Sequence, residues 1–550
     1  MASRTSLPFE LHLSGRRLLY LEIGAVLAAG FLLLLFTLPN LANHPVPTDD
    51  EVWILSASHK LATEGVFGTD LFAGFYRADE VYLFNMPLHH IVLAAAFKVF
   101  GTSILLARLV SVLYGLAALG LVYLLAKQVG GVAVGVLALV LMLLLRLNIG
   151  FDTGLPLQEM ARTIRYDLAP VPFTLAAALI LLRPSPWRCA IAGGLLSIAT
   201  LMQFYGFFML PIAAAYLLWD STPLRTRLTL VGITAVASMA VAAPYAVYVV
   251  ANYHEFEGQT STLERRIHFT DPDFYITNVE RETKRFPFQW NDAKQVLTNR
   301  PSARLAVLIG LPAAAALAGW TAFRQRTAAH RLLFLTLVGL PVQFAVLDSP
   351  KIYFYWIAVM PFLCIGLSYL IVTGLRQLPP LSLETFKQPL RHVVPVGLAG
   401  LAAGFLMIVL VEGSYAQLQG ARAWDDATDY LSLRDRLDDS VPPDAKVVGA
   451  TALWWAMPDT DFRSYYMLFY STNINIAEEQ TTITNYLDDF GVEYIVLNRT
   501  SRMFLRRLIS DDEVQFATYL SKSGERIDYF EDRSYGFIEV WRIDRSTRPR

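Results

Sequence analysis

The sequence predicts a polytopic α-helical membrane protein that carries a small extracytoplasmic α/β domain at its C-terminal end. Of the 550 residues, 54% are hydrophobic and only 17% are charged, and the mean hydropathy is +0.41. This composition is too apolar for an ordinary soluble protein. Apolar runs recur as far as residue 412, after which the composition becomes polar. The net charge of −1 gives no electrostatic reason to expect a nucleic-acid partner.

The apolar runs predict the number of membrane spans. A helix needs about 20 apolar residues to cross the hydrocarbon core, and we expect about 11–13 transmembrane helices in all. Residues 189–219 alternatively form one long broken span, and the shorter run 88–101 is expected to lie along the membrane interface. The candidate spans are residues 19–38, 104–126, 131–149, 168–183, 189–202, 206–219, 228–251, 303–323, 332–348, 353–374 and 393–412.

The charges on the connections between spans predict the face that each connection occupies. Short connections rich in Lys and Arg alternate with acidic or longer ones, and basic connections tend to stay in the cytoplasm. With Arg16 and Arg17 inside, the N-terminus is cytoplasmic and the long loops 40–103 and 252–302 are outside. The first apolar run lacks a convincing cleavage site, so we expect it to remain as a span. The sequence thus indicates a multi-pass protein of the cell (inner or plasma) membrane.

The change of composition predicts two domains. A transmembrane domain covers residues 1–412, and an extracytoplasmic α/β domain covers residues 413–550. Alternating and apolar segments of the second domain predict strands and one amphipathic helix. The expected strands are 445–451, 493–499 and 535–543, and the expected helix is 427–439.

The cysteines and a histidine pair carry no metal signature. Cys189 and Cys364 lie in apolar segments without other ligands nearby, so we expect buried, unpaired thiols. His89 and His90 are adjacent and therefore point to different faces of a helix, which makes a poor two-ligand site. Packing or hydrogen bonding is the preferred interpretation, and His89 is kept as a candidate substrate contact.

The densest acidic cluster, Asp49, Asp50 and Glu51, follows the first span on the predicted outer face. One interpretation is structural, because Thr48 or Asp49 can cap a helix and acidic residues suit its positive end. The other is catalytic. A carboxylate at the boundary between water and lipid is partly desolvated, which raises its basicity, so it can deprotonate an incoming hydroxyl or amine.

A second outer cluster, Arg162, Arg165 and Asp167, stands just before a span. These arginines can bind lipid headgroups, form a structural ion pair with Asp167, or hold a phosphate with the carboxylate orienting them.

Further polar residues lie at the outer ends of later segments. Lys351, Tyr353 and Tyr355 either form an interfacial belt or contact a ligand. In the loop 252–302, Arg265 and Arg266 either meet an anionic headgroup or are simply solvated.

Taken in order, these motifs make the chain resemble the membrane glycosyltransferases with the C-type fold. Within them it resembles the group of the lipid A aminoarabinose transferase and the protein O-mannosyltransferases, over residues 19–375. The motifs that carry the resemblance are Asp50-Glu51 after a span, NMPLHHIVLAAAFKVFG (85–101), the helix that begins LLARLV, RYDLAPVPF with Arg165 and Asp167, and Tyr355 ahead of Pro361.

The resemblance implies transfer of a sugar from a polyprenyl-phosphate carrier to a lipid, glycan or protein acceptor, with inversion in one displacement, outside the membrane. It makes Asp50 the general base, with Asp49 as rival, and Asp167 a second carboxylate that positions the acceptor or a positive partner. Arg165, Lys351 and Tyr355 would contact the phosphate. Further candidate contacts are Glu51, Arg162, Tyr166, His89, Tyr353, Gln203, Tyr205, Arg265 and Arg266.

The chain departs from the family where positive charge is expected. Asn85 replaces a lysine, Phe354 replaces a positive residue before Tyr355, and Gln203 stands where the family often has lysine. A phosphate site would then use Arg77, Arg162, Arg165, Lys351 or the arginines of the outer loop, or else the donor differs.

Two other functions remain as alternatives, a transporter or flippase and a non-catalytic envelope assembly protein. Transporters place charges or broken helices near the midplane and often have inverted repeats. Here the polar residues lie mostly at span ends, which favours the transferase. No cofactor is expected. A divalent ion held by the acidic triplet is the less favoured alternative.

Overall fold

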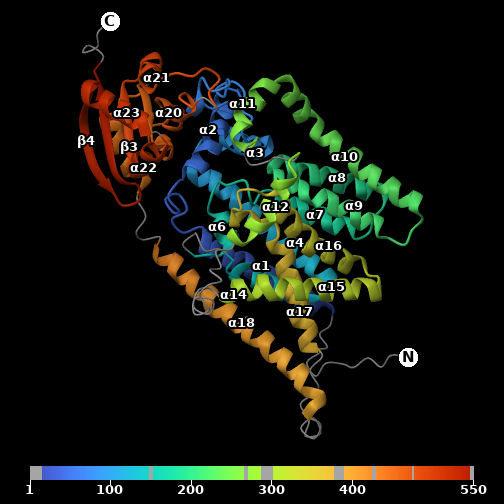
Figure 1. Cartoon of the computed structure of the whole chain (residues 1–550). Helices are drawn as coiled ribbons and strands as arrows, with labels where there is room; N and C mark the ends of the chain where they lie inside the picture. The colour runs from blue at the N-terminus through green and yellow to red at the C-terminus, as the bar shows by residue number, and fades with distance from the viewer. Residues whose placement is uncertain are drawn as a thin grey trace.

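A computed structural model describes residues 15–147, 153–264, 270–285, 301–376, 389–423, 429–473, 476–508 and 510–544. A bundle of helices forms one part, and the C-terminal α/β domain lies at one end of it (Figure 1). The long helix α18 (Pro389–Ala423) runs diagonally along the outside of the bundle toward this domain.

Helices coincide with every expected span, which confirms the polytopic helical class. Within the described residues, six helical runs are long and apolar enough to cross a membrane, so the chain is a multi-pass membrane protein. The short run expected at the interface is α3 (Pro87–Phe100). The spans correspond to α1 (Gly15–Thr37), α4 (Ile104–Gly130), α5 (Val132–Leu144), α7 (Pro170–Leu181), α8 (Pro186–Met202), α9 (Met209–Leu218), α10 (Leu224–Ala251), α14 (Pro301–Arg304) with η4 (Leu305–Gly310) and α15 (Leu311–Gln325), α16 (Ala328–Leu347), α17 (Met360–Arg376) and α18.

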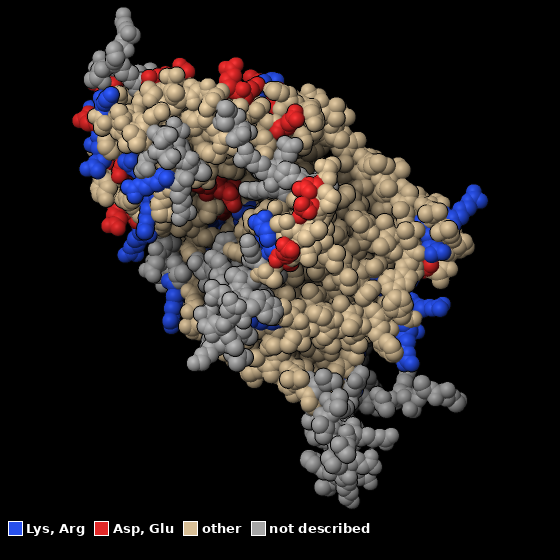
Figure 2. Space-filling view, viewed as in Figure 1, with Lys and Arg blue, Asp and Glu red and all other residues tan. Residues whose placement is uncertain are grey.

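Close backbone approaches hold parts of the bundle together. A Cβ at Gly193 of α8 would lie 2.2 Å from the carbonyl oxygen of Thr234 in α10, so only glycine allows this contact. The space-filling view shows a broad surface without charged side chains between charged regions at the upper left and lower right (Figure 2). Such an uncharged belt is what a membrane environment favours.

The C-terminal domain contains a mixed five-stranded sheet with the strand order β2-β1-β3-β5-β4. β1 pairs in parallel with β2 and β3, and β5 pairs antiparallel with β3 and β4. The three expected strands are present, and the expected helix is α19 (Tyr430–Ser440). The strands are β1 (Lys446–Gly449), β2 (Asp461–Ser464), β3 (Tyr494–Asn498), β4 (Gly524–Asp532) and β5 (Gly536–Ile543).

Two strands were missed in the sequence, for physical reasons. β2 has only four residues, too few to show a period. β4 is an edge strand with most of its residues at least partly exposed, so it carries little apolar patterning.

The loop 40–103, which the sequence predicts to lie outside, packs into the hydrophobic core of the C-terminal domain. This loop contains α2 (Asp49–Thr63) and η1 (Asp70–Phe72). Aromatic rings join the two parts: Trp53 lies 5.3 Å from Tyr466, and Phe75 lies 4.7 Å from Tyr470, between ring centroids. The acidic start of α2 therefore lies between the helical bundle and the C-terminal domain.

Candidate active site

The acidic triplet forms the first turn of α2, and its three side chains make different contacts. Thr48 precedes the helix, and its N–H donates to Glu51 Oε2 at 3.1 Å, which is half of a capping box. Because Val52 and Leu55 are fully buried behind this turn, the helix is fixed in orientation. Each acidic side chain thus has a distinct environment.

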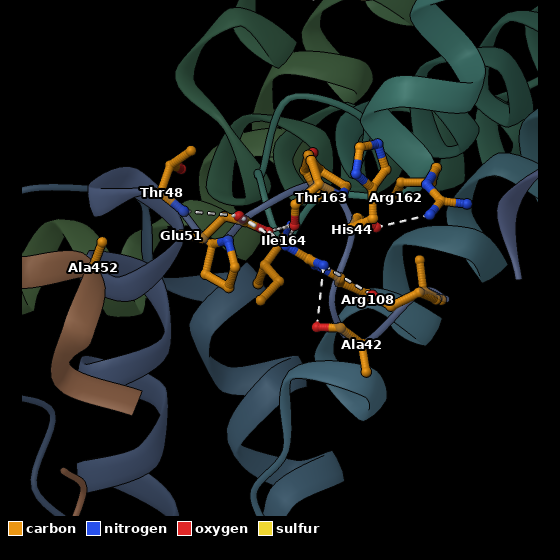
Figure 3. Close-up of polar contacts among 12 residues, drawn as sticks. Ala42, His44, Thr48, Glu51, Arg108, Arg162, Thr163, Ile164 and Ala452 are labelled. Carbon is orange, nitrogen blue, oxygen red and sulfur yellow. Dashed lines mark hydrogen bonds and ion pairs between the residues drawn. The ribbon is translucent and has the colours of Figure 1, made fainter. Parts of the chain in front are cut away.

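Glu51 forms a buried ion pair with Arg108 of α4. Arg108 Nη2 lies 3.1 Å from Glu51 Oε2, and both side chains are almost fully enclosed. The Ile164 N–H donates to Glu51 Oε1 at 2.9 Å (Figure 3). This pair ties α2 and α4 to the segment that carries Arg165. The predicted role of Glu51 in binding substrate stays a prediction that these contacts do not favour.

Arg162 has a similar internal position. Its guanidinium donates to the carbonyl oxygens of Thr37 at 2.9 Å, Pro39 at 3.0 Å and His44 at 2.8 Å (Figure 3). It thereby binds the chain that leaves α1. A phosphate would have to displace these carbonyls, so a structural role is the better interpretation of Arg162.

Arg165 lies between two carboxylates. Its Nη1 forms an ion pair with Asp50, and its Nε donates to Asp167 Oδ2 at 2.8 Å. Asp167 is buried, whereas the Asp50 side chain is 57% exposed. Gln203 Nε2 is 3.4 Å from the other oxygen of Asp167. The structure therefore brings together Asp50, Arg165, Asp167 and Gln203, and of the two carboxylates only Asp50 is open to solvent.

Asp49 is bound by the C-terminal domain. The Tyr465 hydroxyl donates to Asp49 Oδ2 at 3.0 Å, and the N–H of Ala452 in η8 (Thr451–Ala456) donates to Oδ1 at 3.0 Å. Burial raises the pKa of Asp49 to about 6, and the nearby charge of Asp50 adds to this effect, although the hydrogen bonds oppose it. Asp49 is thus already engaged by two donors of the C-terminal domain.

A second ionic cluster joins the end of α16 to the outer loop 252–302. Arg285 Nη2 lies 2.7 Å from Asp348 Oδ2, and Lys351 Nζ lies 2.8 Å from Glu282 Oε2. The Tyr205 hydroxyl donates to Asp348 Oδ1 at 2.5 Å. Lys351 also donates to the carbonyl of Ala345 at 2.7 Å. Burial lowers the pKa of the Lys351 ammonium. Lys351 and Tyr205 thus belong to one cluster, because Arg285 pairs both with Glu282, the partner of Lys351, and with Asp348, the partner of Tyr205.

Aromatic rings of η5 (Tyr353–Ala358) connect the two ionic clusters. The Arg165 guanidinium carbon lies 4.0 Å from the centroid of the Phe354 ring. The neighbouring Tyr355 ring lies 4.6 Å from that of Tyr205. Phe354, which replaces a positive family residue, thus stacks on an arginine. Tyr353 packs edge-on against Phe354 at 5.3 Å.

The remaining candidates lie behind or beyond this group. His89 is buried, and its Nε2 donates to the Ile164 carbonyl at 3.2 Å, so it supports the Arg165 segment from inside. Tyr166 is half-buried next to the aromatic core. Arg265 and Arg266 lie outside the described residues. Among the described residues, no group of three His, Cys, Asp or Glu side chains is arranged to hold a metal ion.

Five residues of the site carried no assigned role in the sequence. Arg108 interrupts an apolar helix, and an arginine in such a run is a usable signal of a buried partner. Asp348 stands directly after a span, which is a weaker signal. Glu282 and Arg285 lie in a polar segment and Tyr465 in an aromatic one, where nothing local distinguishes them.

Comparison with known proteins identifies the fold. No family model matches the chain, and no curated protein matches it. The fold is nevertheless that of the C-type membrane glycosyltransferases, since solved structures of that class match nearly the whole chain.

Three solved structures illustrate this likeness, and at these identities they show the fold alone. One is ArnT from Cupriavidus metallidurans bound to undecaprenyl phosphate, with a TM-score of 0.56 and 14% identity over 98% of this chain and 100% of that one. The apo state of the same ArnT has a TM-score of 0.58 and 16% identity, and the match covers 97% of this chain and 99% of that one. The third is the archaeal oligosaccharyltransferase AglB from Archaeoglobus fulgidus in complex with an inhibitory peptide and a dolichol-phosphate. It has a TM-score of 0.59 and 10% identity, and the match covers 98% of this chain and 75% of that one.

Proposed function

We propose that the protein is an integral-membrane glycosyltransferase, which moves a hexosyl or pentosyl group from a polyprenyl-phosphate donor to a lipid, glycan or protein acceptor on the outer face. The observation that carries this proposal is the Asp50–Arg165–Asp167 arrangement. It sets one solvent-accessible carboxylate beside a fixed cation, next to the C-terminal domain that binds Asp49. The fold supports it, because the matching ArnT and AglB structures hold undecaprenyl phosphate and dolichol-phosphate.

Asp50 acts as the general base. The acceptor hydroxyl or amine attacks the anomeric carbon of the donor, and its proton passes to the Asp50 carboxylate. The bond between that carbon and the phosphate oxygen breaks, and the polyprenyl phosphate leaves with the electron pair. One displacement inverts the anomeric carbon. Asp50 is suited to this step because its side chain is open while Arg165 holds it in place.

Arg165 is the cation nearest to the base and stabilises the charge on the leaving phosphate. Asp167 is buried and fixes the orientation of this guanidinium from behind. Lys351 and Tyr355, from the second cluster, are the further residues proposed to contact the phosphate. Arg285 is fully enclosed and paired with Asp348 and Glu282, so it holds this cluster together and does not replace the positive residues missing at Asn85, Phe354 and Gln203.

The test is sugar transfer by the full-length protein reconstituted in membranes, with a panel of radiolabelled polyprenyl-phosphate sugars and native lipid extract as acceptor. Wild type and Asp167→Asn are compared, with the surface variant Glu80→Gln as a control. We expect transfer from one donor class, lost in Asp167→Asn and kept in the control. Absence of transfer by folded wild-type protein with every donor would contradict the proposal and restore the transporter and assembly alternatives.

A further inference from the structure

A groove of about 380 Å³ lies far from the Asp50 site, where α4 and α7 end and α8 begins. Its lining residues are Gln128, Leu179, Ile180, Leu182, Arg183, Trp187 and Arg188. α7 starts three residues after Asp167 and ends at this groove. A helix of its 12 residues is about 18 Å long, so the groove and the proposed active site lie toward opposite membrane faces.

The two arginines of the groove are not neutralised. Within the described residues, no ion pair joins Arg183 or Arg188 to a carboxylate, whereas Arg331 is paired with Asp220. Arg188 is half-buried, and its Nη1 donates to the Arg183 carbonyl at 3.1 Å. That bond fixes the guanidinium at the groove. Among the residues that the structure describes, no carboxylate therefore compensates the two positive charges beside this cavity.

The walls of the groove are apolar and partly open. Leu179, Ile180 and Leu182 form one side, and Trp187 is 60% exposed. The guanidinium carbon of Arg188 lies 5.1 Å from the centroid of the Trp187 ring. An exposed tryptophan beside arginines at a span end is typical of the level of the lipid headgroups. α8 also begins here, so the positive end of its dipole adds to the two charges.

From this arrangement we infer that the groove binds the phosphate headgroup of an anionic phospholipid in the leaflet opposite to the Asp50 site. The arginines contact the phosphate, and the leucine and isoleucine side chains pack against the upper part of an acyl chain. A phospholipid fits better than a free phosphate, because only a lipid also covers the apolar wall and Trp187. This inference does not depend on the proposed transferase reaction, since it concerns another site.

The experiment is native mass spectrometry of the full-length protein in detergent, titrated with phosphatidylglycerol or phosphatidylcholine. Wild type is compared with Arg183→Gln/Arg188→Gln and with Arg324→Gln. Arg324 is the matched control, because its guanidinium also lies over a tryptophan, Trp320, at 4.9 Å, but at another span end outside the groove. The single variant Arg188→Lys keeps the charge and removes the planar guanidinium.

We expect wild type and Arg324→Gln to bind phosphatidylglycerol more tightly than phosphatidylcholine. The double variant should lose about tenfold or more of that affinity, because both positive charges that attract the lipid phosphate are removed. The affinity of Arg188→Lys for phosphatidylglycerol should lie between those of wild type and the double variant. Equal affinity for both lipids, or an unchanged double variant that remains folded, would overturn the inference. Displacement of the lipid by millimolar glycerol 3-phosphate would also overturn it and assign the groove to a soluble phosphate compound.

Discussion

The Tyr465 hydroxyl donates a 3.0 Å hydrogen bond to Asp49, and this contact joins the C-terminal domain to the first residue of α2. The next acidic residue, Asp50, is the proposed base. The C-terminal domain therefore holds the turn on which catalysis is proposed to depend, and its position is coupled to the geometry of the site. This coupling makes mutations in the domain informative about the site.

Substitution of Tyr465 by phenylalanine should weaken the contact between the domain and the loop. The ring would keep its stacking on Tyr466, 4.5 Å away, but Asp49 would lose one of its two donors. A partly buried acceptor left without a partner costs about 1–3 kcal/mol, so thermal unfolding in detergent should begin at a lower temperature. Tyr529→Phe, on the exposed strand β4, is the control and should have little effect. Equal behaviour of the two variants would argue against the contact.

The sequence predicts the helical framework well because a membrane span is a local property. Each span needs only a continuous apolar run, and the short basic connections indicate its ends. Likewise, the strands 446–449, 494–498 and 536–543 carry their own apolar pattern. β2 and β4 lack such a pattern and become strands only through their neighbours in the sheet.

The site was predicted in part, again for a physical reason. Asp50, Arg165 and Asp167 could be proposed because each stands near the end of a predicted span, where polar residues are conspicuous. The contact between Asp50 and Arg165 joins positions 115 residues apart in the chain. The contact between Tyr465 and Asp49 joins positions 416 residues apart, and no local feature of either segment indicates it.

The stability of the protein should depend on the protonation of Asp49. Burial raises its pKa in the folded protein to about 6, whereas an unfolded chain releases this proton near pH ~4. Between these values the unfolded state binds fewer protons than the folded state, so stability falls as the pH rises from about 4 to 6 and stays level above. Asp49→Asn removes this dependence. Thermal unfolding of both proteins is measured at pH 4.5 and 7.5. The unfolding temperature of the variant, relative to that of wild type, should be higher at pH 7.5 than at pH 4.5. A constant difference between them would contradict this prediction.

Glu51→Gln should destabilise the protein strongly. It leaves the Arg108 guanidinium buried without its carboxylate, and breaking a buried pair in this way typically costs about 3–5 kcal/mol. We expect little folded protein, measured by size-exclusion chromatography after extraction from membranes. The matched control is Glu525→Gln, which removes an exposed pair with Arg542 and should leave the yield unchanged. A normal yield of Glu51→Gln, with transfer lost, would instead support the substrate-binding interpretation of Glu51.

Lys351→Gln should weaken binding of the donor more than it slows the chemical step. If the ammonium contacts the lipid phosphate, its loss should raise KM for the donor about tenfold, equivalent to about 1.4 kcal/mol, with a smaller change in kcat. Lys60→Gln is the control, since Lys60 lies in the first outer loop and pairs with Asp70 instead. A fall in kcat at constant KM would place Lys351 outside the phosphate site.

The most direct test of the central claim compares transfer by Asp50→Asn and Asp49→Asn in the same reconstituted membranes. Asp50 has the exposed carboxylate beside Arg165, while Asp49 is engaged by Tyr465 and Ala452. The loss of a general base lowers the rate by about 10²–10⁴-fold, so Asp50→Asn should lose transfer to that extent. Asp49→Asn should retain most of it. Full activity of Asp50→Asn, with loss in Asp49→Asn, would contradict the assignment and make Asp49 the base.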